Sequence, residues 1–253
     1  MSDLNKLETT AAVAGERRDF LKASAGLAGL AVAPGVLLYG ISAHGRSPHE
    51  PASAAVRWGM LIDTTKCAAG CSDCVSACNT ENGLSGETGP QDSQWIRKLN
   101  IRNLQSGVEH NLPMLCQHCE NPPCVDVCPT GASMKRVDGI VLVDRHICIG
   151  CRYCMMACPY KARSFVHEPL TDQNPEVPRG KGCVESCTFC VQRVDRDETP
   201  ACVEACNAAG HQAMVFGDLN DPQSSIAQTI KTVASTEVRA DLGLNTGVRY
   251  QGI

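Results

Sequence analysis

Four closely spaced cysteines in residues 148–159 limit what this chain can fold into more than any other feature of the sequence. The segment reads Cys148-Ile149-Gly150-Cys151-Arg152-Tyr153-Cys154-Met155-Met156-Ala157-Cys158-Pro159, which is C-x2-C-x2-C-x3-C-P. With this spacing, a loop binds one [4Fe–4S] cluster through three thiolates, and the fourth cysteine ligates a second cluster. A second run is therefore expected elsewhere in the chain, because each of the two clusters still lacks a ligand.

Three further cysteine runs are present. The first, Cys67 to Cys78, is C-x3-C-x2-C-x3-C with Asn79 in place of the proline. The second, Cys116 to Pro129, is C-x2-C-x4-C-x3-C-P, and the fourth, Cys187 to Cys206, is C-x2-C-x11-C-x3-C. Of the seventeen cysteines, only Cys183 falls outside the four runs.

Other uses of cysteine fit this pattern less well. An odd number of cysteines in a chain of 253 residues argues against a disulfide framework, which is typical of much smaller chains. Cysteines in a C-x2-C-x2-C segment also pair poorly with one another, given disulfide geometry. Zinc ribbons use two C-x2-C pairs but no fourth cysteine followed by proline. No C-x2-C pair is followed by histidine, as covalent haem requires.

The composition narrows the function classes. Aromatic residues make up only 4 % of the chain, so bound clusters would supply folding free energy that large side chains do not. The net charge of −4 and the absence of a Lys/Arg-rich run argue against nucleic acid as a partner. Neither a phosphate-binding glycine motif nor a Ser/His/Asp constellation is recognisable, so no catalytic site is expected.

The N-terminus predicts export. Glu16-Arg17-Arg18-Asp19-Phe20-Leu21-Lys22 precedes a weakly apolar run over residues 23–38, which is typical of a twin-arginine (Tat) signal. We assign the signal to residues 1–43, with cleavage near Ala43 or as late as residue 54. An uncleaved anchor and a short amphipathic helix are the alternatives. Export of an already folded protein would let clusters be inserted first, so we expect the periplasm or the outer face of the cytoplasmic membrane.

Residue patterns predict mixed helices and strands. We expect a strand over residues 57–63, strands around residues 95–99 within an insertion at 79–115, and a hairpin with an Asp138-Gly139 turn. A surface loop is expected over residues 164–182, a helix over residues 224–235, and extended chain near residues 248–250. The predicted fold class is α+β.

Four runs in this order, with x4 in the second and x11 in the fourth, resemble the four-cluster ferredoxin subunits of membrane-bound respiratory oxidoreductases. The segment Phe216-Gly217-Asp218-Leu219-Asn220-Asp221-Pro222 is similar to one near their C-termini. The resemblance implies a duplicated bacterial-ferredoxin-like domain over residues 56–225, built of two 2[4Fe–4S] units with loop insertions. A C-terminal docking extension would follow over residues 226–253. The export signal, the C-x3-C first run and its lead-in, residues 62–67, look most like the DsrO group, the periplasmic ferredoxin-like subunits of DsrMKJOP complexes.

This resemblance implies four [4Fe–4S] clusters and their ligands, because the family pairs run one with run four and run two with run three. The implied sets are Cys67, Cys71, Cys74 and Cys206; Cys78, Cys187, Cys190 and Cys202; Cys116, Cys119, Cys124 and Cys158; and Cys128, Cys148, Cys151 and Cys154. Cys183 is then a spare thiol, or else it replaces a ligand. The widened first run leaves open a loosely held cluster or a [3Fe–4S] form.

The resemblance also implies a function. We expect a periplasmic electron-transfer subunit that relays single electrons between an integral membrane, quinone-interacting subunit and a c-type cytochrome in a sulfite- or sulfur-metabolism complex. One alternative is the electron-transfer subunit of a molybdopterin enzyme that reduces polysulfide, thiosulfate or tetrathionate. Another is a free-standing cluster protein.

Several side chains near the runs have a less specific reading. His118 is expected to form a local hydrogen bond rather than to ligate a metal. Met155 and Met156 are expected to pack around the clusters. The basic residues Arg152, Lys161 and Arg163 either tune a cluster potential or are solvated, and we favour solvation.

Overall fold

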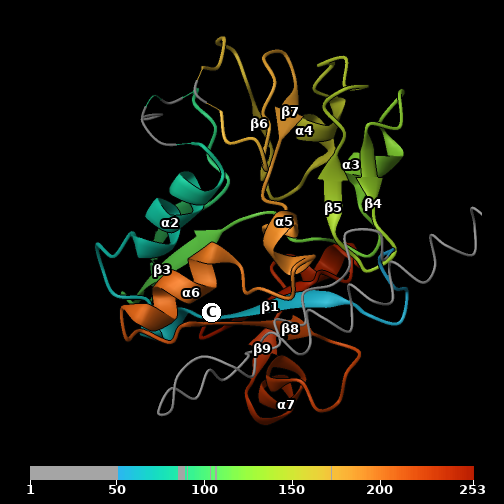
Figure 1. The fold of residues 1–253 in the computed structure, drawn as a ribbon. Coiled ribbons are helices and arrows are strands. Elements are labelled where there is room, and N and C mark those ends of the chain that lie inside the picture. Colours follow the sequence, from blue (N-terminus) through green and yellow to red (C-terminus); the bar gives the residue numbers. More distant parts are fainter. Residues whose placement is uncertain (1–50, 85–88, 90, 103, 106, 172) are drawn as a thin grey trace, which may run out of the picture. The chain divides into compact units, whose positions relative to one another are not determined.

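The computed structural model describes residues 51–253, apart from residues 85–88, 90, 103, 106 and 172 (Figure 1). The predicted export signal at residues 1–43 lies outside the described residues and stays a prediction. The part that is described forms a single unit. Within that part, no helix has the length and apolar character needed to span a membrane.

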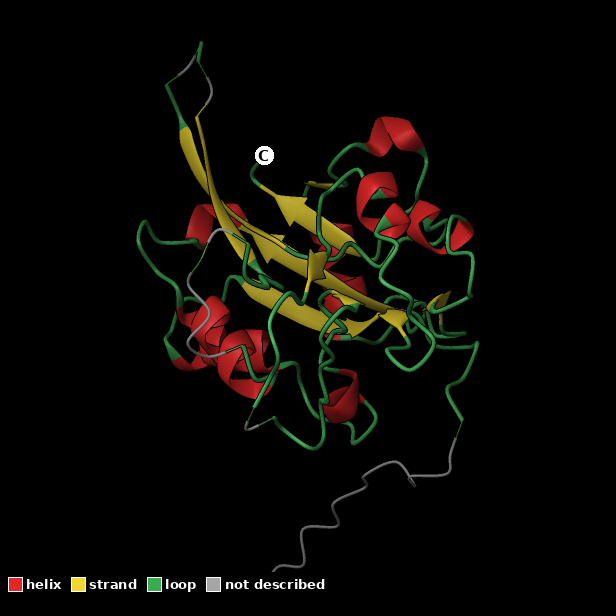
Figure 2. Ribbon diagram, turned by 90° about the horizontal axis from the view of Figure 1, so that it is seen from above, coloured by secondary structure: helices red, strands yellow, loops and turns green. Residues whose placement is uncertain are grey.

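A four-stranded sheet joins the beginning of the described chain to its end (Figure 2). Its order is β8 (Met214–Asp218), β1 (Trp58–Asp63), β10 (Val248–Gln251) and β9 (Ser235–Thr236). Strand β1 pairs in parallel with β10 and antiparallel with β8. Met60, Leu61 and Ile62 of β1 are all buried, so both faces of this strand are covered. The strand predicted at residues 57–63 is present.

The C-terminal residues belong to this sheet rather than to a separate layer. Val248 and Tyr250 of β10 are fully buried, and Gln251 pairs with both Asp63 and Ser235. The helix predicted over residues 224–235 is α7 (Ser225–Thr232), which packs on β8 and β1. Its N-cap is Ser224, whose Oγ accepts a hydrogen bond from the Ala227 amide at 3.2 Å. Residues 226–253 therefore complete the core, and their predicted docking role stays a prediction.

Two pairs of helices contain six of the sixteen cysteines of the four runs. Helix α2 (Asp73–Glu81) packs against α6 (Ala201–Ala208), and α3 (Pro123–Asp126) packs against α4 (Tyr153–Ala157). Figure 1 shows the first pair on one side of the ribbon and the second pair on the other. One short helix, α5 (Val191–Val194), follows Cys190. The described residues also contain the 3-10 helices η2 (Thr64–Lys66) and η3 (Ala240–Leu242).

Three antiparallel hairpins lie outside the sheet. They are β2 (Arg97–Arg102) with β3 (Glu109–Met114), β4 (Ser133–Lys135) with β5 (Val141–Val143), and β6 (Ser164–Phe165) with β7 (Val184–Glu185). The second is the predicted hairpin, and Gly139 in its turn has a φ of 88°, which glycine adopts readily. The described part of the chain thus has the predicted mixture of helices and strands.

Candidate iron–sulfur centres

Site A is the group Cys67, Cys71, Cys74 and Cys206, which line one small pocket. Cys67 follows η2, Cys74 lies in the first turn of α2, and Cys206 comes from α6. Burial raises the pKa of Cys74 to about 11, and the ammonium group of Lys98, on β2 in the wall of the same pocket, opposes that rise. The first and fourth runs therefore meet at this site.

Site B is the group Cys78, Cys187, Cys190 and Cys202, none of which is more than 5 % exposed. Burial raises the pKa of Cys187 well above its ordinary value, and repulsion from Cys78, Cys202 and Cys190 adds to the rise, so the four thiols are neighbours. The Asn82 amide nitrogen lies 3.6 Å from the Cys78 Sγ and 3.9 Å from the Cys190 Sγ. A neutral side-chain donor therefore faces this site.

Site C is the group Cys116, Cys119, Cys124 and Cys158, which line a second small pocket. Cys124 comes from α3, and Cys158 follows α4 directly. Burial raises the pKa of Cys116 to about 12, while the nearby guanidinium group of Arg163 lowers it. The second and third runs meet here.

Site D is the group Cys128, Cys148, Cys151 and Cys154, which line a third small pocket. Cys151 is exposed, unlike the other fifteen cysteines of the four groups. The leftover Cys183 is buried near Cys148 of this site, and its thiol donates to the Arg145 carbonyl at 3.3 Å. Cys183 stands only four residues before Cys187 in the sequence, yet it lies beside the third run and not the fourth.

The C-x3-C spacing explains how each helix serves two sites. Residues i and i+4 lie on the same face of a helix, one turn apart. Helix α2 accordingly presents Cys74 to site A and Cys78 to site B, and α6 presents Cys206 and Cys202 to the same two sites. Around α4, Cys154 and Cys158 serve sites D and C in the same way.

His118 connects the two pairs of sites. It is 2 % exposed, and its Nδ1 accepts a hydrogen bond from the Val141 amide at 3.0 Å. Its ring stacks on Phe189, between two cysteines of site B, with the ring centroids 3.6 Å apart. Burial lowers the pKa of His118 to about 3, and Arg163 adds to this effect. The expected local hydrogen bond of His118 is confirmed.

The three basic residues beside the third run differ in environment. Arg152 is exposed with its guanidinium 3.8 Å from the centre of the Phe165 ring, and Lys161 is exposed. Arg163 is only 5 % exposed, and its Nη2 donates to the Cys124 Sγ at 3.1 Å. Our preference for solvation was therefore wrong for Arg163. The C-x3-C-P spacing gives no signal for this burial, because Arg163 contacts Cys124, which lies 39 residues earlier in the chain.

Sequence reasoning also missed a polar group at the mouth of site A. Potential ligand atoms of Cys71, Asp73 and His211 lie within 4.8 Å of one another. Cys71 is 3.4 Å from the Asp73 carboxylate, and His211 Nε2 is 3.7 Å from the same carboxylate. His211 follows α6 at a long distance in sequence from Asp73, so only the packing of α2 on α6 brings them together.

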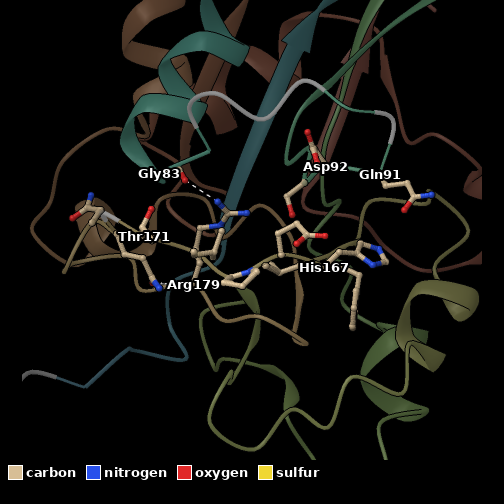
Figure 3. A pocket seen from close by; sticks show the side chains of 14 residues that line it. Gly83, Gln91, Asp92, His167, Thr171 and Arg179 are labelled. Atoms are coloured by element: carbon tan, nitrogen blue, oxygen red, sulfur yellow. Dashed lines mark hydrogen bonds between the residues drawn. The ribbon is translucent and has the colours of Figure 1, made fainter.

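A separate pocket, drawn in Figure 3, has no cysteine among its fourteen lining residues. It is lined by Gly83 and residues 91–93 on one side and by residues 165–171, 173–174 and 179 on the other. Arg179 holds its wall, because its Nη1 donates to the Gly83 carbonyl at 2.7 Å and its Nη2 pairs with Glu185 at 2.7 Å. This pocket is formed where the two insertions meet, apart from sites A to D.

The donor chemistry of the four groups fits iron–sulfur clusters. Each group offers four thiols, and the cysteines of sites A, C and D line one pocket each. Buried polar atoms also lack partners there: Nε and Nη1 of Arg163 in the wall of site C and Oγ of Ser133 in the wall of site D have no hydrogen-bond partner within the described residues. The inorganic sulfides of a cluster would supply acceptors for such donors.

Comparison with known proteins agrees with this chemistry. The family described as 4Fe-4S dicluster domain matches residues 109–219, so the chain contains a ferredoxin-like domain of the iron–sulfur class. The Hdr-like menaquinol oxidoreductase iron-sulfur subunit 1 of Archaeoglobus fulgidus is 41 % identical over 265 residues, covering 92 % of this chain and 97 % of the relative.

Two further relatives belong to other complexes. A tetrathionate reductase subunit of Salmonella typhimurium is 39 % identical, over 76 % of this chain and 74 % of the relative. A sulfite dehydrogenase subunit of Allochromatium vinosum is 35 % identical, over 76 % and 81 %. The chain belongs to this family of iron–sulfur electron-transfer subunits of oxidoreductase complexes, which are not catalytic subunits.

Proposed function

We propose that the chain holds four [4Fe–4S] clusters, one at each of sites A to D, and relays single electrons through them. The observation that carries this proposal is the gathering of sixteen cysteines into four groups of four thiols. The protein would space the clusters, exclude water and set their potentials, since the redox chemistry belongs to the cofactor. The duplicated ferredoxin-like architecture implied by the sequence is part of this proposal, and a three-iron cluster at site A is its variant.

The order of transfer would be A–B–C–D, in either direction. Sites A and B share α2 and α6, sites B and C meet at the Phe189–His118 stack, and sites C and D share α4. Sites A and D are thus the ends. Cys67 and Cys71 at one end and Cys151 at the other are more exposed than any cysteine of site B or C, which supports electron exchange with partners at both ends.

Our preferred partners are an integral membrane, quinone-interacting subunit and a c-type cytochrome subunit, as in a DsrO-like sulfite- or sulfur-metabolism complex at the outer face of the membrane. The relative of Archaeoglobus fulgidus, named as a menaquinol oxidoreductase subunit, supports a link to quinone. The twin-arginine motif in residues 16–22 supports export.

A second candidate has a molybdopterin catalytic subunit as the partner. The 39 % identity to a tetrathionate reductase subunit favours it. Both candidates retain the same electron relay and differ in the partner subunit with which the relay exchanges electrons.

The deciding experiment is to capture the full chain from native membranes under anaerobic conditions and to analyse the complex. Iron and acid-labile sulfide in the amounts required by four cubanes are expected, and a preparation lacking both would refute the relay. C-type haem without molybdenum would support the DsrO-like assembly. Molybdenum or tungsten without haem would assign the chain to a reductase, and capture of the chain alone would mean a free-standing cluster protein.

A further inference from the structure

Arg163 is a buried cation that the relay alone does not explain. Its side chain lies in the wall of site C, where its Nη2 donates to Cys124 at 3.1 Å. Cys116 of site C and Cys154 of site D are close enough to interact electrostatically with its charge. One guanidinium therefore lies near ligands of two different groups.

Among the described residues, no acidic side chain pairs with Arg163 to offset its burial. Within the described residues, Arg163 forms no ion pair with a carboxylate, and its Nε and Nη1 have no hydrogen-bond partner. A buried charge without an ion partner is costly, and so is a buried donor without an acceptor. Anionic clusters at sites C and D would remove both costs, because thiolates and sulfides carry negative charge and accept hydrogen bonds.

We propose that Arg163 is a positioning residue for electron transfer, because its positive charge raises the reduction potentials of the clusters at sites C and D together. This inference rests on the proposed cluster binding. Reduction of either cluster adds one electron and one negative charge, without a change in covalent bonds. A fixed positive charge in a poorly solvated setting favours the more negative, reduced form. Since one guanidinium lies near ligands of both sites, its charge acts on the two potentials together.

The other two sites have different neighbours. Site B faces the neutral amide of Asn82, and site A faces Lys98, which is partly exposed and therefore better screened. The effect of Arg163 is accordingly expected at C and D and not at A and B.

The test is an anaerobic redox titration followed by electron paramagnetic resonance on the full, cluster-loaded chain. Wild type is compared with Arg163→Met, Arg163→Lys and Arg163→Gln. The matched control is Arg152→Met, which removes an exposed arginine next to Cys151 of site D. Signals are assigned to sites C and D by their loss in Cys119→Ser and Cys151→Ser.

In Arg163→Met, we expect the ratio of reduced to oxidised cluster at a given potential to fall at least tenfold at both C and D, which is 59 mV for a one-electron couple. Arg152→Met should shift them less, and Arg163→Lys should stay nearest to wild type. The proposal is overturned if Arg163→Met retains all its iron and its potentials are unchanged, or if the potential of only one of the two sites shifts. It is also overturned if Arg152→Met shifts the potentials as much as Arg163→Met does.

Should Arg163→Met lose iron, the other two variants decide, because lysine and glutamine both keep a donor but only lysine keeps the charge. Equal potentials in these two variants would then refute the electrostatic role. A wild-type chain without iron would instead refute the proposed function itself, so the two failures are distinguishable.

Discussion

Cys183 shows how far the environment of a single residue can depart from its sequence context. It stands four residues before Cys187 of site B, yet its buried thiol lies against Cys148 of site D. The hydrogen bond to the Arg145 carbonyl holds it there. Site D has its own four cysteines, so Cys183 is a neighbour of the site and not needed as a ligand.

Replacement of Cys183 by alanine is therefore expected to leave iron and acid-labile sulfide at wild-type levels. The control is Cys154→Ala, which removes a buried thiol of the same site and should lower both contents by the share of one cluster. Iron and sulfide analysis of the anaerobically purified proteins checks this. A loss of iron in Cys183→Ala equal to that in Cys154→Ala would make Cys183 a ligand.

Gly150, inside the third run, is fixed by two constraints. Its φ is +68°, and a Cβ at this position would lie 2.2 Å from the Gly182 carbonyl oxygen. We expect Gly150→Ala to cost about 1–2 kcal/mol for the left-handed backbone and more for the displaced loop. Gly131→Ala is the control, because its φ is +71° but its Cβ would meet nothing within 4 Å. Thermal bleaching of the cluster absorbance should occur at a lower temperature in the first variant than in the second.

At the scale of elements, the β4–β5 hairpin and helix α7 were predicted from the sequence, whereas the packing of α2 on α6 was not. The Asp138-Gly139 turn is a local signal, and so are the C-x3-C intervals that define the cysteine runs. The burial of Arg163 and the grouping of Asp73 with His211 depend on pairings between distant segments, which periodicity does not encode. The fold class and the four cysteine runs thus came from local chemistry, and the residues around the sites came only from tertiary contacts.

Strand β10 gives a test of the core. The Tyr250 hydroxyl donates to the Pro113 carbonyl at 3.1 Å and accepts from the Gln117 amide at 3.1 Å. Tyr250→Phe leaves both groups short of a buried partner, so we expect a loss of about 1–3 kcal/mol. Tyr153→Phe, at an exposed tyrosine of α4, should change little. Anaerobic thermal unfolding compares the two, and equal midpoints would show that the Tyr250 hydrogen bonds contribute nothing.

For the whole molecule, the core has an unusual composition. It contains buried cysteines from all four groups alongside few aromatic side chains, of which Trp95, Phe189 and Tyr250 are among the largest that are fully buried. Burial raises the pKa of most of these thiols, so a chain without metal would enclose many neutral thiols in place of a cross-linked framework.

Removal of iron is therefore expected to destabilise the whole described domain and not just the loops. Chelation under anaerobic, reducing conditions should lower the midpoint of thermal unfolding by on the order of 10 °C or more, because metal binding and folding are coupled. Circular dichroism measures this, with a mock-treated sample as the control. An unchanged midpoint after complete iron loss would show that side-chain packing alone sustains the fold.

The pairing of β1 with β10 has a consequence for the order of biosynthesis. All cysteines of sites C and D lie within residues 116–158, whereas sites A and B also need Cys202 and Cys206. Strand β1 lacks its neighbour β10 until residues 248–251 have left the ribosome. The middle of the chain can thus mature while synthesis continues, and the first residues of the domain must wait for the last. Under the proposed twin-arginine export, which admits folded cargo, the C-terminal strand would act as the final checkpoint before the chain leaves the cytoplasm.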